Sequence, residues 1–140
     1  MLLIDNSAFA RLSNRDVPQP RRDEISDMAL RRELATSLPF LLEAGYSATS
    51  GADHARILTA LQQLPRFSIT ERVEDLATDT QRILAQHGHH RVAPVDLIIA
   101  AIAVENGCGV LHYDKHYDLL RDKAGLRFES VWLAPRGSLD

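Results

Sequence analysis

The chain begins with a continuous apolar run, Met1-Leu2-Leu3-Ile4, that stops abruptly at Asp5 and the polar residues after it. A run without polar alternation is typical of a strand buried on both faces, and such strands belong to parallel sheets covered by helices. Further strands are expected near residues 34–36, 110–113 and 127–133, and residues 66–70 form either another strand or an extended link, with helical periodicity between these segments. Strands that alternate with helices predict βαβ units, and therefore an α/β fold with a mostly parallel sheet of four or five strands.

The helix expected after Pro94, running to Asn106, is apolar nearly all round, which places it in the core. Gly107 and Gly109 end it. The other helices are expected from amphipathic spacing at residues 8–14, 21–33, 40–44, 57–64, 76–87 and 115–124.

A chain of 140 residues with 45% apolar content fits one domain spanning residues 1–140. The formal net charge of −3 argues against a passive RNA-coating protein, because such proteins are normally basic. The first apolar run ends too early for a signal peptide, and the longest one, residues 97–104, is too short to span a bilayer. We therefore expect a cytoplasmic protein without a membrane segment, and the single Cys108 is compatible with a reducing compartment.

Four carboxylates stand where apolar residues surround them. Asp5 follows the first strand, Glu43 follows Phe-Leu-Leu, Asp96 precedes a long apolar helix, and Asp114 follows Val-Leu-His-Tyr. A charge at such a position is unfavourable unless it is paired, hydrogen-bonded or bound to a metal. Each acid also has an ordinary explanation, such as a loop position, a helix first turn or an arginine partner.

Topology favours a shared site. Asp5 and Asp114 end two different strands, and sites in open parallel sheets form outside the carboxyl ends of strands. Asp96 starts the helix that leads into the second of these strands, so it can reach the same edge. Carboxylates gathered in one pocket repel one another unless a cation neutralises them, and oxygen ligands favour a hard divalent ion such as Mg²⁺ or Mn²⁺.

The segments that carry these acids resemble the motif set of PIN-domain ribonucleases, and most of all that of the VapC toxins of bacterial VapBC toxin–antitoxin pairs. The resemblance extends over nearly the whole chain in length, order and spacing. The segments are Leu2-Leu3-Ile4-Asp5-Asn6-Ser7, the Leu42-Glu43 helix, Pro94-Val95-Asp96-Leu97-Ile98-Ile99-Ala100-Ala101 and Val110-Leu111-His112-Tyr113-Asp114-Lys115-His116-Tyr117-Asp118.

The resemblance implies a three-layer α/β/α PIN-like fold and a catalytic set of four acids. Asp5, Asp96 and Asp114 match the family's metal-binding aspartates. Glu43 matches its glutamate, which acts as a ligand directly or through water. If these four acids form a metal site, 16 basic residues face 15 remaining acidic ones, so the rest of the chain is close to neutral.

Three further residues near these motifs are candidates for supporting groups or extra ligands. Ser7 matches the family's small hydroxyl residue, which is expected to bond a carboxylate or a metal-bound water; an N-cap role is the alternative. The family often has another acid two residues after its fourth, and His116 stands there in this chain. Asp118 is a possible compensating ligand or supporting group, with a solvated helix position as the alternative.

The implied activity is Mg²⁺- or Mn²⁺-dependent hydrolysis of RNA phosphodiester bonds, leaving a 5′-phosphate and a 3′-hydroxyl. The implied partners are an RNA substrate, an inhibitory VapB-type antitoxin and a second copy of the chain, with the helices of residues 21–64 as contact surfaces. Arg91, a few residues before Asp96, is a candidate for binding RNA phosphate. The alternative function is a PIN-like module that has lost catalysis and acts mainly through protein binding.

Zinc and two other acidic-site folds fit less well. The histidines and the cysteine follow no closed tetrahedral spacing; they are His87, His89, His90, Cys108, His112 and His116. A haloacid-dehalogenase phosphatase needs a second Asp where Ser7 stands, and a receiver domain needs paired early acids. Neither explains Glu43 and Asp96 together.

Overall fold

The computed structural model describes residues 1–89 and 91–139. Five short strands form one sheet: β1 (Leu2–Ile4), β2 (Leu34–Ser37), β3 (Arg66–Phe67), β4 (Gly109–His112) and β5 (Ser130–Trp132). Their order is β3-β2-β1-β4-β5, and every neighbouring pair is parallel. The predicted α/β class is therefore confirmed, and the sheet is parallel throughout rather than mostly so.

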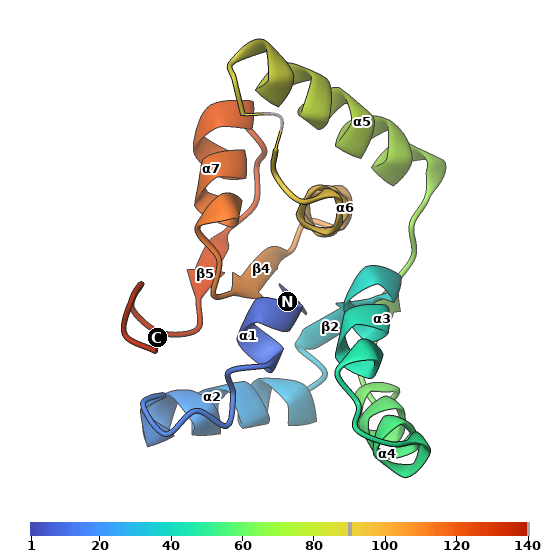
Figure 1. The fold of residues 1–140 in the computed structure, drawn as a ribbon, viewed down its shortest axis with the longest axis vertical. Helices are drawn as coiled ribbons and strands as arrows, with labels where there is room; N and C mark the ends of the chain where they lie inside the picture. Colours follow the sequence, from blue (N-terminus) through green and yellow to red (C-terminus); the bar gives the residue numbers. More distant parts are fainter. Residues whose placement is uncertain (90, 140) are drawn as a thin grey trace.

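The helices in the described part of the chain are α1 (Asn6–Phe9), α2 (Gln19–Leu30), α3 (Leu38–Tyr46), α4 (Gly51–Leu61), α5 (Glu71–Gln86), α6 (Pro94–Glu105) and α7 (Lys115–Ala124). The sheet crosses the middle of the molecule, with α6 on one side of it and α2 on the other (Figure 1). This arrangement is the three-layer α/β/α fold of PIN-like proteins.

A large part of the core forms between the sheet and α6, and the buried cluster also includes Ile25 of α2 and Leu61 of α4. Strands β2 and β4 are buried along their whole length, as expected for central strands covered on both faces. Most of α6 is buried, from Asp96 to Ala103, which confirms that it is a core helix. Its packing against β1, β4 and α5 fixes the position of its first turn relative to the ends of the strands.

Several elements differ from their predicted bounds, the first helix and the last strand among them. The first helix spans Asn6–Phe9 rather than residues 8–14, because the Asp5 side chain caps its start and the chain continues beyond it as tight turns. Strand β5 pairs with β4 only from Ser130 to Trp132, whereas the apolar pattern predicts residues 127–133. Phe128 is buried without being a paired strand residue, so its burial contributed to that longer pattern.

Within the described residues, no helix is long and apolar enough to cross a membrane.

Candidate metal centre and active site

The carboxyl ends of β1 and β4 bring two distant acids to one edge of the sheet. The strands pair in parallel with Ile4 opposite Leu111, and the Asp5 amide donates to the Leu111 carbonyl at 2.9 Å. Asp5 follows β1 directly, and Asp114 lies two residues beyond the end of β4. The strand order therefore places both acids where ligand sites form in parallel sheets.

Each of the three aspartates stands at the start of a helix. Asp5 is the N-cap of α1 and accepts a hydrogen bond from the Ser7 amide at 2.9 Å. Asp114 is the N-cap of α7 and accepts one from the His116 amide at 2.9 Å. Asp96 lies in the first turn of α6. Free N–H groups at a helix start favour negative charge, so local backbone geometry holds these carboxylates in place.

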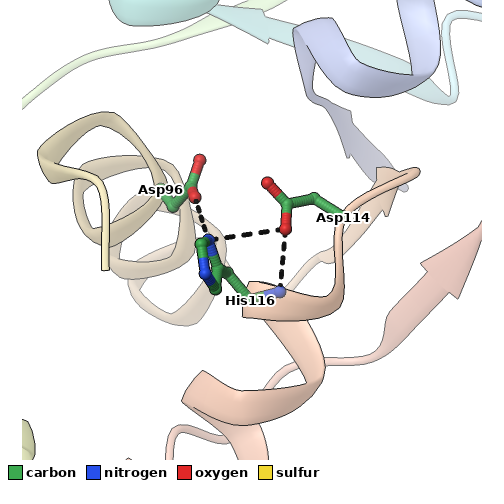
Figure 2. Close-up of side chains that lie close together, drawn as sticks. All are labelled: Asp96, Asp114 and His116. Carbon is green, nitrogen blue, oxygen red and sulfur yellow. Dashed lines mark hydrogen bonds and ion pairs between the residues drawn. The ribbon is translucent and has the colours of Figure 1, made fainter. Parts of the chain in front are cut away.

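Asp96, Asp114 and His116 offer ligand atoms that all lie within 4.8 Å of one another. Figure 2 shows the imidazole of His116 between the two carboxylates. Its Nδ1 is 3.3 Å from Asp96 Oδ2 and 3.5 Å from Asp114 Oδ1. Two carboxylates and one imidazole in this arrangement form a donor set that suits a divalent cation.

The electrostatics of Asp96 also fit a cation at this edge. Burial raises the pKa of Asp96 to about 7, and the charges of Asp114 and Asp5 add to the effect. Without a positive partner, the ionised form of this carboxyl is therefore unfavourable near neutral pH. A bound cation would remove much of this penalty, because it offsets both the repulsion and the lost hydration.

Asp5 lies beside this group of three and is held by other partners. Its Oδ2 accepts hydrogen bonds from the amide and the hydroxyl of Ser7, and its Oδ1 accepts one from the Tyr117 hydroxyl. Ser7 therefore bonds the Asp5 carboxylate, while Asp5 itself provides the helix cap. The Ser7 hydroxyl also accepts from the Tyr113 amide at 2.9 Å, which ties α1 to the segment after β4.

Tyr117 is a site residue that the sequence interpretation missed. Its side chain is fully buried, its hydroxyl donates to Asp5 Oδ1 at 2.8 Å, and it stands 3.5 Å from Asp96 Oδ1. Burial, followed by the charges of Asp5 and Asp96, raises the pKa of Tyr117 well above its usual value, so the phenol remains a donor. The position three residues after Asp114, one helical turn into α7, was a usable signal, because it directs a side chain back toward the helix start.

A second supporting arrangement connects Asp118 to Asp114. Asp118 accepts from Ser130 Oγ at 2.5 Å and from Trp132 Nε1 at 2.9 Å. His112 Nε2 is 2.6 Å from the same Ser130 oxygen, and His112 Nδ1 accepts from the Asp114 amide at 3.1 Å. Asp118 therefore faces β5 rather than the three donor atoms, and it supports Asp114 through a chain of side chains.

The protonation of His112 follows from these contacts. Because Ser130 donates its hydroxyl proton to Asp118, it accepts from His112, so Nε2 carries the hydrogen and Nδ1 is the acceptor. Burial lowers the pKa of His112 to about 4, in agreement with a neutral ring. His112 is thus a fixed link between Ser130 and the backbone of Asp114.

Glu43 and Arg91 line two different surface pockets near this edge. Glu43 is half-buried on α3, and it lines one surface pocket together with Asn6 and Val95. Burial raises the pKa of Glu43, and the charge of Asp5 adds to the shift. Arg91 is exposed and lines a hollow of about 220 Å³ together with His116. Arg91 and His116 thus share one surface hollow.

The histidines and the cysteine considered for zinc do not gather into a site of their own within residues 1–89 and 91–139. The one group of potential ligands found there is Asp96, Asp114 and His116. His112 is committed to its neighbours, Cys108 is buried as a free thiol, and His90 lies outside the described residues.

Comparison with known proteins decides the family. The sequence matches the family described as PIN domain over residues 2–123. The chain belongs to the PIN-domain family. Its PIN relatives include ribonuclease VapC2 of Mycobacterium tuberculosis strain CDC 1551, 35% identical over 136 residues that cover 95% of this chain and 94% of the relative. Ribonuclease VapC51 of M. tuberculosis strain H37Rv is 33% identical over 99% of this chain and 96% of its own length.

Solved structures give the same fold. The DNA-bound VapBC structure from Salmonella typhimurium contains a chain that superposes with a TM-score of 0.70 at 20% identity, covering 96% of this PIN chain and all of that one. VapBC2 from Rickettsia felis superposes with a TM-score of 0.71 at 15% identity, covering 92% of this chain and 97% of that one. At these identities the likeness establishes the PIN fold.

Proposed function

We propose that this chain is a VapC-like endoribonuclease, a single PIN domain over residues 1–140 that hydrolyses RNA phosphodiester bonds with Mg²⁺ or Mn²⁺. One observation carries the proposal: the convergence of Asp96, Asp114 and His116 donor atoms within 4.8 Å at the strand ends, with Asp5 beside them. Full-length relatives named as ribonucleases support the reaction class.

Asp5, Asp96 and Asp114 would hold the ion, with Glu43 as a fourth catalytic carboxylate at the flank of the site. When bound, a divalent ion would favour attack by water and offset the charge of the phosphodiester. Ser7 and Tyr117 orient the Asp5 carboxylate by donating to its two oxygens. Arg91 supplies a positive charge next to the site, suited to an RNA phosphate.

Two apolar surfaces fit the proposed protein partners. Leu38, Leu42 and Tyr46 lie four residues apart on α3, and they are 47%, 64% and 92% exposed, a stripe we assign to a second copy of the chain. A groove of about 600 Å³ lies among α1, α2 and α4, with Ile25, Ala29, Leu30, Leu61 and Leu64 in its walls. We assign the groove to a helix of a VapB-type antitoxin, because a hydrophobic groove between helices accepts an apolar helix face.

The test of the proposed function is cleavage of total cellular RNA by the purified protein with added Mg²⁺ or Mn²⁺. Wild-type protein should produce fragments with 5′-phosphate ends, and EDTA should stop the reaction. Asp5→Asn and Asp96→Asn should abolish cleavage while keeping the circular dichroism spectrum of the fold. Asp75→Asn, which changes an exposed carboxylate on α5, is the matched control and should cleave normally.

Full activity in Asp5→Asn or Asp96→Asn would refute the assigned site. Absence of cleavage by the wild-type protein under all these conditions would favour the alternative, a PIN-like module that acts through protein binding. Mapping the cut positions would identify the RNA.

A further inference from the structure

The ring of His116 is turned toward the carboxylates of Asp96 and Asp114. The imidazole Nδ1 faces Asp96 Oδ2 at 3.3 Å and Asp114 Oδ1 at 3.5 Å (Figure 2). The backbone amide of His116 donates to the same Asp114 oxygen, so the first turn of α7 fixes the start of this side chain. About two thirds of the side chain is shielded from solvent.

Two arrangements explain a ring nitrogen that faces two carboxylates. In one, the nitrogen carries a proton and the imidazolium serves as an internal cation. In the other, the nitrogen gives its lone pair to a metal ion that the two carboxylates also bind. Donor atoms on one octahedral ion lie about 3 to 4 Å apart, since each stands about 2.1 Å from the ion, and both measured distances fall in that range.

We infer that His116 Nδ1 is a ligand of the ion held by Asp96 and Asp114, and that this nitrogen makes the site favour Mn²⁺ over Mg²⁺. The inference rests on the proposed function, because it concerns the ion of that site. Carboxylate oxygens suit both ions, whereas imidazole suits transition metals and Mg²⁺ is bound almost entirely by oxygen. A neutral imidazole ligand also brings no negative charge, so it adds nothing to the charge attraction on which Mg²⁺ binding depends.

The direct test is pulsed electron paramagnetic resonance of Mn²⁺ bound to the full-length protein. A directly bound imidazole gives a ¹⁴N hyperfine coupling, and ¹⁵N-histidine labelling should change it in the manner expected for the isotope. The coupling should be present in wild-type protein and absent in His116→Asp and His116→Gln. It should persist in His54→Gln, the matched control, because His54 is exposed on α4.

The second test is competition between the two ions, followed through the signal of free Mn²⁺. Wild-type protein should require a large excess of Mg²⁺ to release Mn²⁺. The carboxylate variant His116→Asp should lower the ratio of Mg²⁺ to Mn²⁺ dissociation constants by about tenfold or more, mainly through tighter Mg²⁺ binding. His54→Gln should leave the ratio unchanged.

Three outcomes would overturn the inference: no Mn²⁺ binding, bound Mn²⁺ without nitrogen coupling, or tighter Mn²⁺ binding in His116→Gln, which identifies the ring as a competing internal cation. Each is separable from failure of the proposed function. RNA cleavage without nitrogen coupling would support the ribonuclease activity and show that His116 is not a ligand of its ion. Nitrogen coupling without RNA cleavage would support the ion site and refute the proposed ribonuclease activity.

Discussion

The hydroxyl of Tyr117 donates a 2.8 Å hydrogen bond to the carboxylate of Asp5, which lies 112 residues earlier in the chain. The same hydroxyl stands 3.5 Å from Asp96 Oδ1. A buried phenol therefore separates two carboxylates that would otherwise repel each other directly. It also joins α7 to the end of β1, so the spacing of the site depends on one side chain that belongs to the core.

Replacing Tyr117 with Phe should lower the rate of RNA cleavage by about 10- to 100-fold, since groups that orient metal ligands usually contribute in that range. The ring still fills its place against His112 and Phe128, so the fold should persist. Single-turnover kinetics on a defined RNA would measure the loss. Asp75→Asn is the control, because Asp75 is exposed on α5. Equal cleavage rates in both variants would show that Tyr117 does not contribute to the site.

Interrupting the series of hydrogen bonds that connects Asp118 to Asp114 should lower both the stability and the activity of the protein. Ser130→Ala removes the hydroxyl that bridges His112 and Asp118, leaving the buried His112 Nε2 without its acceptor. We expect the free energy of unfolding to fall by about 1 to 3 kcal/mol, the usual cost of a buried polar group that loses its partner. Urea unfolding measures the change, with Ser138→Ala near the C-terminus as the control. An unchanged midpoint would show that the bridge is energetically neutral.

The metal-free protein should respond to pH through two opposing groups. The raised pKa of Asp96 stabilises the folded state fully below about pH 4, and this contribution disappears as pH rises toward 7. The lowered pKa of His112 acts in the other direction: its contribution is present above pH 6.5 and disappears as pH falls toward 4. Asp96→Asn removes the first effect and leaves the second.

Asp96→Asn should therefore be more stable than wild type in EDTA at pH 7.5, by at most about 4 kcal/mol, since one pKa unit corresponds to about 1.4 kcal/mol. The advantage should shrink steadily as pH falls to 4.5. Urea unfolding at four pH values between these limits measures it, with Asp75→Asn as the control for loss of an exposed carboxyl. A stability difference that does not vary with pH would contradict the assigned burial of the Asp96 charge.

The exposed stripe on α3 should control self-association. Leu42→Glu places a charge in the middle of Leu38, Leu42 and Tyr46, and it should convert the proposed dimer to monomer without unfolding the chain. Light scattering coupled to size exclusion measures the mass. Leu30→Glu, in the groove assigned to the antitoxin, should leave the dimer intact. A mass that is the same for wild type and Leu42→Glu would place the contact elsewhere or show that the chain is monomeric.

Local pattern was sufficient for the fold class and for the place of the main acids along the chain. The apolar run before Asp5 and the apolar helix after Asp96 report burial within a few residues of each acid, and burial is what makes a carboxylate at these positions informative. Helix starts at Asp96 and Asp114 were likewise predictable, because first-turn and cap preferences depend on neighbouring residues.

The sequence pattern predicted the bounds of helices and strands less well than it predicted the fold class. The buried Phe128 suggested a longer last strand, since an apolar pattern records burial and not hydrogen-bond pairing. The sequence pattern also could not predict the order of the strands in the sheet. Because β1 lies next to β4, Asp5 and Asp114 follow neighbouring strands, and many strand orders are compatible with the same series of strands.

By itself the sequence determined that this is a parallel α/β chain with acids at strand and helix ends, because those features depend on residues close together in the chain. Only the tertiary structure decided which side chains meet: Asp96 and Asp114 with His116, Asp5 with Tyr117, and Asp118 with Ser130. The physical reason is that hydrogen bonds and ligand sets depend on distances below about 4 Å between atoms. Such distances arise from the packing of α6 and α7 at the strand ends rather than from spacing along the chain.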